Sequence, residues 1–174
     1  MTASCSGQSL TGRWKVQKVK LLDMMHTKNF TIDLTKPDKV KKDMLSSFFQ
    51  EPQEEGFEID TAEIKADIDK TVVAYQKAEL TLMDNKIFDM VSNGLLVLTS
   101  VPGWHFGDSL TGTWTKSNDL LTLSIGDNNQ GYQWKFKILQ LTSKNLKLQQ
   151  ISQGTKDTND MLDGPENEIE FKRQ

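Results

Sequence analysis

Apolar and polar side chains alternate along residues 10–22, which is the pattern of a β-strand with one buried face. Trp14 and Val16 lie on the same face, but the next apolar residue is Val19, so the phase slips by one position. A β-bulge near Gln17 would keep one face of the strand apolar. We therefore predict a first strand over residues 10–22 with a bulge in its middle.

A helical period replaces this alternation after Leu34. Thr35 and Pro37 form a cap and first-turn signature, and a helix of about three or four turns should follow and end near Pro52. Its apolar positions are Val40, Met44, Leu45, Phe48 and Phe49. A second helix is predicted after Asp60, which forms a capping-box pattern with Glu63. Its narrow apolar stripe consists of Ile64, Ile68, Val72 and Tyr75.

From Ala78 onward, short apolar runs alternate with turn residues at intervals of about ten residues, as in a β-sandwich or β-barrel. The predicted strands cover residues 79–83, 87–91, 95–100, 109–116, 120–125, 131–141, 145–151 and 168–172. Residues 152–165 are mostly polar and have no period, which predicts a long loop before the last strand.

The expected fold is mainly β, a single antiparallel up-and-down barrel of about 8–10 strands, because closure removes the exposed edges of such a sheet. The two helices form an insertion between the first and second strands, over about residues 36–76. Residues 1–8 are expected to be a flexible tether, and residues 9–174 the barrel domain. An open sheet backed by the two helices, in an α+β arrangement, is the alternative.

One short sequence occurs twice, since Ser9–Trp14 is echoed by Ser109–Trp114. In both copies a glycine, Gly12 or Gly112, precedes the tryptophan by two positions. A glycine at the start of a strand permits a bulge or a close approach of two backbones. We expect each tryptophan to project into the barrel as a large plug.

Composition excludes several classes of function. The chain has 21 Lys and Arg against 24 Asp and Glu, so no basic excess is available to neutralise the phosphates of a nucleic acid. No apolar run reaches the length of about 20 residues that a membrane-spanning helix needs. The single cysteine, Cys5, cannot form an internal disulfide.

The residues around Cys5 resemble the end of a bacterial lipoprotein signal, in which small residues precede the cysteine that becomes acylated. This resemblance implies lipid attachment at Cys5 and a location in the cell envelope, in the periplasm or at the outer membrane. An ordinary flexible N-terminus is the alternative. Contact with a membrane is expected through this anchor alone.

Several strand motifs resemble those of lipocalin-like proteins. Residues 10–16, with the Gly12–Trp14 spacing, resemble the opening Gly-x-Trp strand of lipocalins and fatty-acid-binding proteins. Residues 112–114, 120–123 and 132–148 resemble the second half of small bacterial lipocalin-like envelope proteins. The resemblance implies a calycin-type barrel, with an interior that holds a small hydrophobic ligand. The chain departs from fatty-acid-binding proteins because it has no late arginine and tyrosine set for a carboxylate.

Few residues or motifs in the sequence suggest catalysis. His26 and His105 lie far apart in the sequence, without the spacing of metal ligands around either. Cys5 lies in the expected tether, and no phosphate-binding loop or nucleophile elbow is present. We therefore expect a protein that is not an enzyme and that uses no cofactor and no metal.

Two functions fit these observations. The first is a non-catalytic envelope protein that binds a small hydrophobic ligand inside the barrel, beneath the helices. The candidate residues of the interior or lid are Trp14, Phe48, Phe49, Tyr75, Phe88, Met90, Trp104, Trp114, Trp134 and Phe136. The alternative is an envelope interaction or scaffold module, with a filled barrel and a protein partner on the helices or at Trp104.

Overall fold

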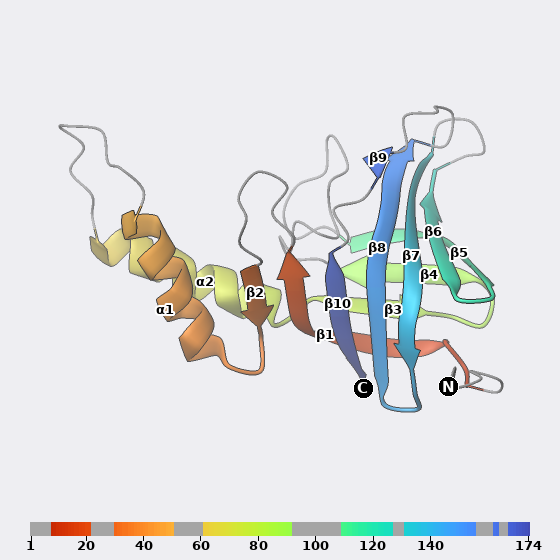
Figure 1. The fold of residues 1–174 in the computed structure, drawn as a ribbon, viewed down its shortest axis with the longest axis horizontal. Helices are drawn as coiled ribbons and strands as arrows, with labels where there is room; N and C mark the ends of the chain where they lie inside the picture. Colours follow the sequence, from red (N-terminus) through yellow and green to blue (C-terminus); the bar gives the residue numbers. More distant parts are fainter. Residues whose placement is uncertain are drawn as a thin grey trace.

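The computed structural model describes residues 8–21, 30–50, 61–91, 109–126, 131–155, 162–163 and 167–174. These residues form ten strands and two helices (Figure 1). The elements are β1 (Gly12–Leu21), β2 (Phe30–Asp33), α1 (Pro37–Gln50), α2 (Thr61–Tyr75), β3 (Glu79–Leu82), β4 (Ile87–Val91), β5 (Ser109–Ser117), β6 (Leu120–Ile125), β7 (Tyr132–Leu141), β8 (Asn145–Thr155), β9 (Leu162–Asp163) and β10 (Glu168–Arg173).

Eight of these strands form a closed antiparallel barrel. The order around the ring is β1, β3, β4, β5, β6, β7, β8 and β10, and β10 returns to pair with β1. Sequential strands pair along most of the ring, as the tight turns predict. The short strands β2 and β9 add to the ring by pairing with β1 and β8. The mainly β barrel predicted from the sequence is therefore confirmed.

Most local predictions hold. The pairing of β1 with β10 shifts register between Val16 and Lys18, which confirms the predicted bulge at Gln17. The described strands β3 to β8 and β10 agree with the predicted ranges to within a few residues, whereas β9 lies inside the predicted loop over residues 152–165 and was not predicted. The predicted strand over residues 95–100 lies outside the described residues.

Two local predictions need correction. The sequence analysis missed β2, which has four residues and is held by pairing with the end of β1, so the helical insertion begins after β2. The loop predicted from residue 152 is wrong as far as Thr155, because β8 continues to that residue opposite Tyr132. In both cases the segment is held by pairing with the strand that precedes it in the sequence, β1 for β2 and β7 for the end of β8.

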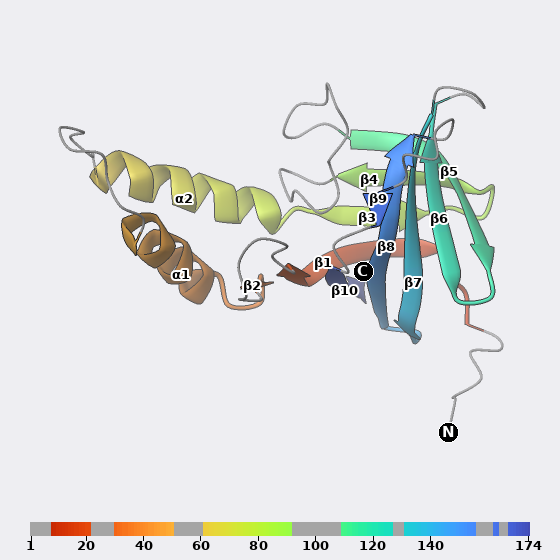
Figure 2. The same ribbon diagram turned by 45° about the horizontal axis from the view of Figure 1, so that its top comes forward.

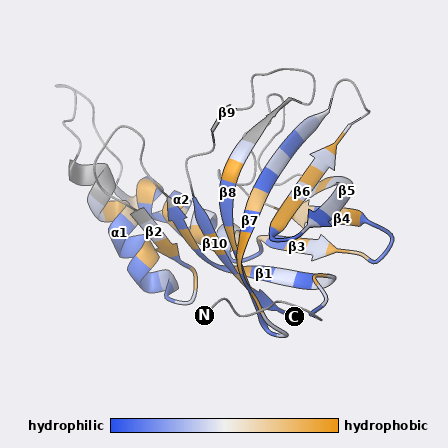
Figure 3. Cartoon of the chain, turned by 45° about the vertical axis from the view of Figure 1, so that its right-hand side comes forward, coloured by the Kyte–Doolittle hydropathy of each residue, from blue (hydrophilic) through white to orange (hydrophobic). Residues whose placement is uncertain are grey.

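Alternation of side chains places one continuous hydrophobic core inside the barrel. Along β3, β4 and β6 every second residue is buried, and the residues between them are partly exposed. Figure 3 shows the resulting alternation of hydrophobic and hydrophilic residues along the strands. Because the side chains on successive strand residues point to opposite faces, one face of each strand supplies the core.

The two helices pack against each other and extend away from the barrel to one side (Figures 1 and 2). Val40 of α1 and Val72 of α2 are buried in the hydrophobic core, and Met44 and Ile68 pack against it. Lys41 of α1 also pairs with an α2 carboxylate at 2.7 Å. The hairpin therefore reaches the barrel at one side, and its predicted role as a cover over a ligand stays a prediction.

The two ends of the barrel differ in their connections. At one end, here called the short-turn end, residues 83–86, 118–119 and 142–144 join consecutive strands. Lys86 and Asn118 adopt positive φ angles of 66° and 55° in two of these turns. The opposite end, here called the long-connection end, receives the connections through residues 22–29, 92–108, 126–131 and 156–166. The helical insertion also enters β3 at this end.

Candidate functional site

The short-turn end is plugged first by Trp14 of β1, which is fully buried. Its indole Nε1 donates a hydrogen bond to the carbonyl oxygen of Leu10 at 2.8 Å. The guanidinium of Arg173, at the end of β10, lies 4.5 Å from the centre of the Trp14 ring. Gly12 adopts a φ of 136°, which an L side chain rarely reaches, so a glycine is needed here for its backbone conformation and not for the predicted bulge or close backbone approach.

Trp114 of β5 forms a second plug at the same end. Its Nε1 donates to the Met83 carbonyl at 3.0 Å, and the Lys86 ammonium lies 4.0 Å from the centre of its ring. A Cβ atom on Gly112 would lie 2.2 Å from the backbone oxygen of Ser124. The backbones of β5 and β6 therefore lie close together at Gly112, where the sequence predicted a close approach. Plugs and short turns together seal this end of the barrel.

The structure brings the other described candidates of the interior together in the same core. Phe88, Met90, Trp134 and Phe136 are each at most 1% exposed. Tyr75 is partly buried at the end of α2, where it packs against the core, and burial raises its pKa. In this part of the barrel, side chains fill the space, so any ligand must share the interior with them.

Four candidates cannot be placed. Cys5 and Trp104 lie outside the described residues, and so do both histidines. Phe48 and Phe49 belong to α1, but their side chains lie outside the described part of the structure.

A buried polar pair lies toward the long-connection end, and the sequence analysis missed it. Gln150 is 1% exposed and Asn167 is 5% exposed. The Asn167 Nδ2 donates to Gln150 Oε1 at 3.4 Å, and the Gln150 backbone N–H donates to the Asn167 carbonyl at 2.8 Å. Gln150 continues the inward row of Leu146 and Leu148, so the alternation along the predicted strand already contained its inward position.

Trp134 lies near this pair in the sheet. It stands two residues before Phe136, and Phe136 is the cross-strand partner of Gln150. Its side chain is fully buried and its ring centre lies 4.8 Å from that of Tyr132. In contrast to the two plugs, the Trp134 Nε1 has no hydrogen-bond partner among the described residues. A buried donor without an acceptor is rare in folded proteins and costs free energy.

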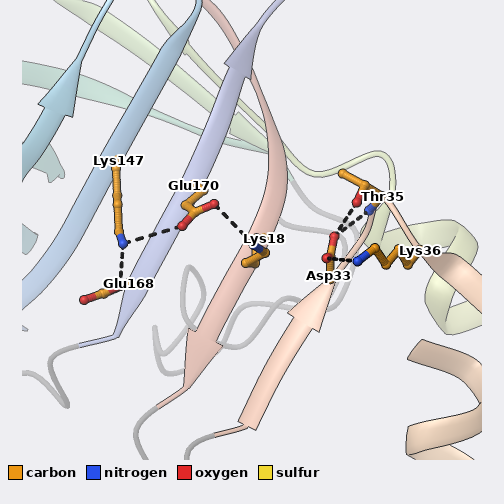
Figure 4. A network of polar contacts seen from close by, with 7 residues as sticks. All are labelled: Lys18, Asp33, Thr35, Lys36, Lys147, Glu168 and Glu170. Carbon is orange, nitrogen blue, oxygen red and sulfur yellow. Dashed lines mark hydrogen bonds and ion pairs between the residues drawn. The ribbon is translucent and has the colours of Figure 1, made fainter. Parts of the chain in front are cut away.

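Charged side chains lie on the outer face of the strands. Figure 4 shows Lys147 of β8 between two carboxylates of β10, with Glu168 at 2.7 Å and Glu170 at 3.5 Å. Glu170 also faces Lys18 of β1 at 3.7 Å. The hydrogen bond from Lys147 lowers the pKa of Glu168, and the same bond raises the pKa of Lys147. This network crosses the seam where β10 closes the barrel.

Within the described residues, the buried polar side chains are uncharged, namely Gln150 and Asn167. In the same part of the chain, no group of three or more His, Cys, Asp or Glu residues is arranged to hold a metal ion. Among the described helices, none is long and apolar enough to cross a membrane. The candidate site is therefore the apolar interior near Trp134, with its amide pair.

Comparison of the sequence with protein-family models and with curated proteins identified no relative. No protein-family model matches the sequence, and no curated protein is significantly similar to it. The architecture, a closed eight-stranded antiparallel barrel with a helical hairpin, is compatible with a calycin-like fold.

Proposed function

We propose that this protein is a non-catalytic, lipocalin-like binding protein that holds a small hydrophobic molecule in the long-connection end of its barrel. The observation that carries the proposal is the difference between the two ends. Trp14 and Trp114 plug one end, and the other combines apolar walls with the buried polar groups of Trp134, Gln150 and Asn167. Small-molecule sites typically have this composition of mostly apolar lining and a few polar groups.

Barrel size supports the same proposal. A barrel of about eight strands is just wide enough to be filled by side chains or to hold one small ligand. Because the plugs occupy the short-turn end, the ligand is assigned to the half that contains Met90, Trp134 and Gln150.

The proposal assigns no chemical step to the chain. The described interior offers carboxamides and an indole, and neither group acts as a nucleophile or general base at neutral pH. Carboxamide and indole groups are suited to binding a ligand and not to catalysis.

A location in the cell envelope, with a lipid anchor at Cys5, is part of the proposal. β1 begins at Gly12, at the short-turn end, seven residues after Cys5. An acyl group at Cys5 would therefore hold the plugged end toward the membrane and leave the long-connection end facing away from it. Mass spectrometry of the protein from bacterial membranes tests this, since a Cys5→Ser variant should lose both the acyl mass and the membrane association.

Native mass spectrometry of protein purified without added ligand is the first test of binding. A mass above the denatured mass by one small molecule supports the proposal. Next, the neutral dye N-phenyl-1-naphthylamine should gain fluorescence in the barrel and be displaced by apolar competitors. Val73 of α2 is 47% exposed, so Val73→Asp should leave a dye bound in the barrel unaffected.

The helical hairpin favours a second candidate function. Because α1 and α2 extend away from the barrel, they are well placed to meet a protein partner in an envelope scaffold (Figure 2). This alternative predicts a clean unliganded mass, no displaceable dye and a partner lost with the hairpin. A displaceable dye that Val73→Asp does not affect argues for the barrel site instead.

A further inference from the structure

Three buried tryptophans of the described barrel differ in how their indole N–H groups are satisfied. Trp14 and Trp114, at the short-turn end, donate to the backbone oxygens of Leu10 and Met83. Trp134 lies near the start of β7, at the opposite end, and its Nε1 has no acceptor in the part of the chain that the structure describes, although the side chain is fully buried. The indole N–H groups at the short-turn end therefore have acceptors, whereas the one toward the long-connection end has none among the described residues.

The surroundings of Trp134 show which acceptor would suit it. On neighbouring interior positions the buried polar side chains are Gln150 and Asn167, which already bond to each other through side chain and backbone. Both are uncharged, and Lys135 of β7 and Lys147 of β8, which alternate with inward residues, are partly exposed.

An anionic ligand would be costly in this place. Moving a carboxylate out of water without a paired cation is much more expensive than moving a neutral oxygen. Arg173 is at the opposite end, where it lies over Trp14 and its Nη2 donates to the Ser9 carbonyl at 2.6 Å, although its buried Nε also has no hydrogen-bond partner among the described residues. A neutral acceptor, in contrast, would satisfy the indole without introducing a buried charge.

We propose that Trp134 Nε1 is the hydrogen-bond donor that anchors the ligand, and that the ligand is a neutral apolar molecule with a carbonyl or hydroxyl oxygen. This inference rests on the proposed binding function and narrows its ligand class. Trp134 acts as the polar anchor, and the apolar walls hold the rest of the molecule. The Gln150–Asn167 pair keeps the neighbouring positions polar and neutral.

The test uses three probes of similar size that differ at one group: propiophenone, propylbenzene and 3-phenylpropanoate. Nuclear magnetic resonance of the full ¹⁵N-labelled chain follows the indole N–H signals. The Trp134→Phe variant assigns the Trp134 signal by its loss. Propiophenone should move that signal downfield and bind about three- to tenfold more tightly than propylbenzene, the range expected for one neutral hydrogen bond. 3-Phenylpropanoate should bind most weakly.

Variants separate the anchor from general packing. Trp134→Phe should bind propiophenone and propylbenzene equally. Trp114→Phe, the same change at the plugged end, should keep the preference for the ketone. Triple-resonance spectra of the unmodified protein give the same assignment of the Trp134 indole signal, so the test stands even if a variant does not fold.

Two results would overturn the inference in different ways. Equal binding of propiophenone and propylbenzene with an unmoved Trp134 signal would remove the anchor but leave the binding function standing. Absence of binding by all three probes, together with a clean unliganded mass, would reject the proposed function and the anchor with it.

Discussion

The guanidinium group of Arg173 lies 4.5 Å from the centre of the Trp14 ring and reaches past it to the carbonyl of Ser9. The last strand of the barrel is thus fastened to the segment that leads into the first. β10 and β1 also pair along six positions from Trp14↔Arg173 to Lys20↔Glu168. The contact seals the short-turn end and helps to close the ring.

Loss of this contact should destabilise the barrel. Arg173→Ala removes a cation–π contact and a charged hydrogen bond, and we expect the free energy of unfolding to fall by about 2 kcal/mol. Arg13→Ala is the matched control, because the Arg13 side chain is 65% exposed where it pairs with Glu79, and its loss should cost less than that of Arg173. Urea unfolding followed by tryptophan fluorescence measures both. Equal losses would mean that the Trp14 contact contributes nothing special.

The two glycines of the repeated motif should respond differently to alanine. At Gly112 a Cβ would overlap the Ser124 oxygen at 2.2 Å, so Gly112→Ala should cost about 3 kcal/mol or prevent folding. At Gly12 the nearest atom is 3.6 Å away, and the cost comes from the positive φ, at about 1–2 kcal/mol. Thermal unfolding of both variants makes the comparison. A Gly12→Ala variant that is the less stable of the two would contradict the close approach at Gly112.

Hydrogen bonding predicts an order of stability for the tryptophan variants. Trp114→Phe removes one of the two hydrogen bonds that the Met83 carbonyl accepts and leaves it only the one from the Lys86 N–H, whereas Trp134→Phe removes an N–H that has no acceptor among the described residues. Both changes remove similar volume from the core. We therefore expect Trp114→Phe to be less stable by about 1 kcal/mol in the ligand-free protein. Chemical denaturation after removal of bound small molecules checks this, and the reverse order would show that Trp134 is satisfied in solution.

The ion pairs at the barrel seam give stability a defined pH dependence. The pKa of Glu168 is lowered from its ordinary value of 4.5, so its contribution is present above that pH and is lost as the pH falls through the folded-state pKa. The pKa of Lys147 is raised from 10.5, so its contribution is present below that pH and is lost as the pH rises through the folded-state pKa. Glu168→Gln should therefore cost about 0.5–1 kcal/mol at pH 7.

Unfolding experiments on the wild type and on Glu168→Gln between about pH 2 and pH 7 test this window. The difference between the two proteins should shrink as the pH falls and also in high salt, which screens exposed charges. A difference that stays constant down to the lowest pH would mean that the carboxylate is not the stabilising group.

Strand positions, inward faces and the glycine–tryptophan motifs could be predicted from the sequence because they depend on local periods. The bulge at Gln17 is such a case, since the slip of phase is visible in the order of residues. Inward positions of Trp114 and Trp134 likewise follow from alternation, and both are buried. The helices were predictable from their caps and apolar spacing.

Local order along the chain was thus enough to specify a barrel of alternating strands and most of the residues that line it. Only the tertiary structure decided that β2 pairs with β1, that the helical hairpin extends to one side, and that Gln150 meets Asn167. It also decided that Trp114 finds an acceptor 31 residues away at Met83, whereas Trp134 finds none. Periodicity is a local property, but the partner of a buried polar group depends on which distant strand closes over it.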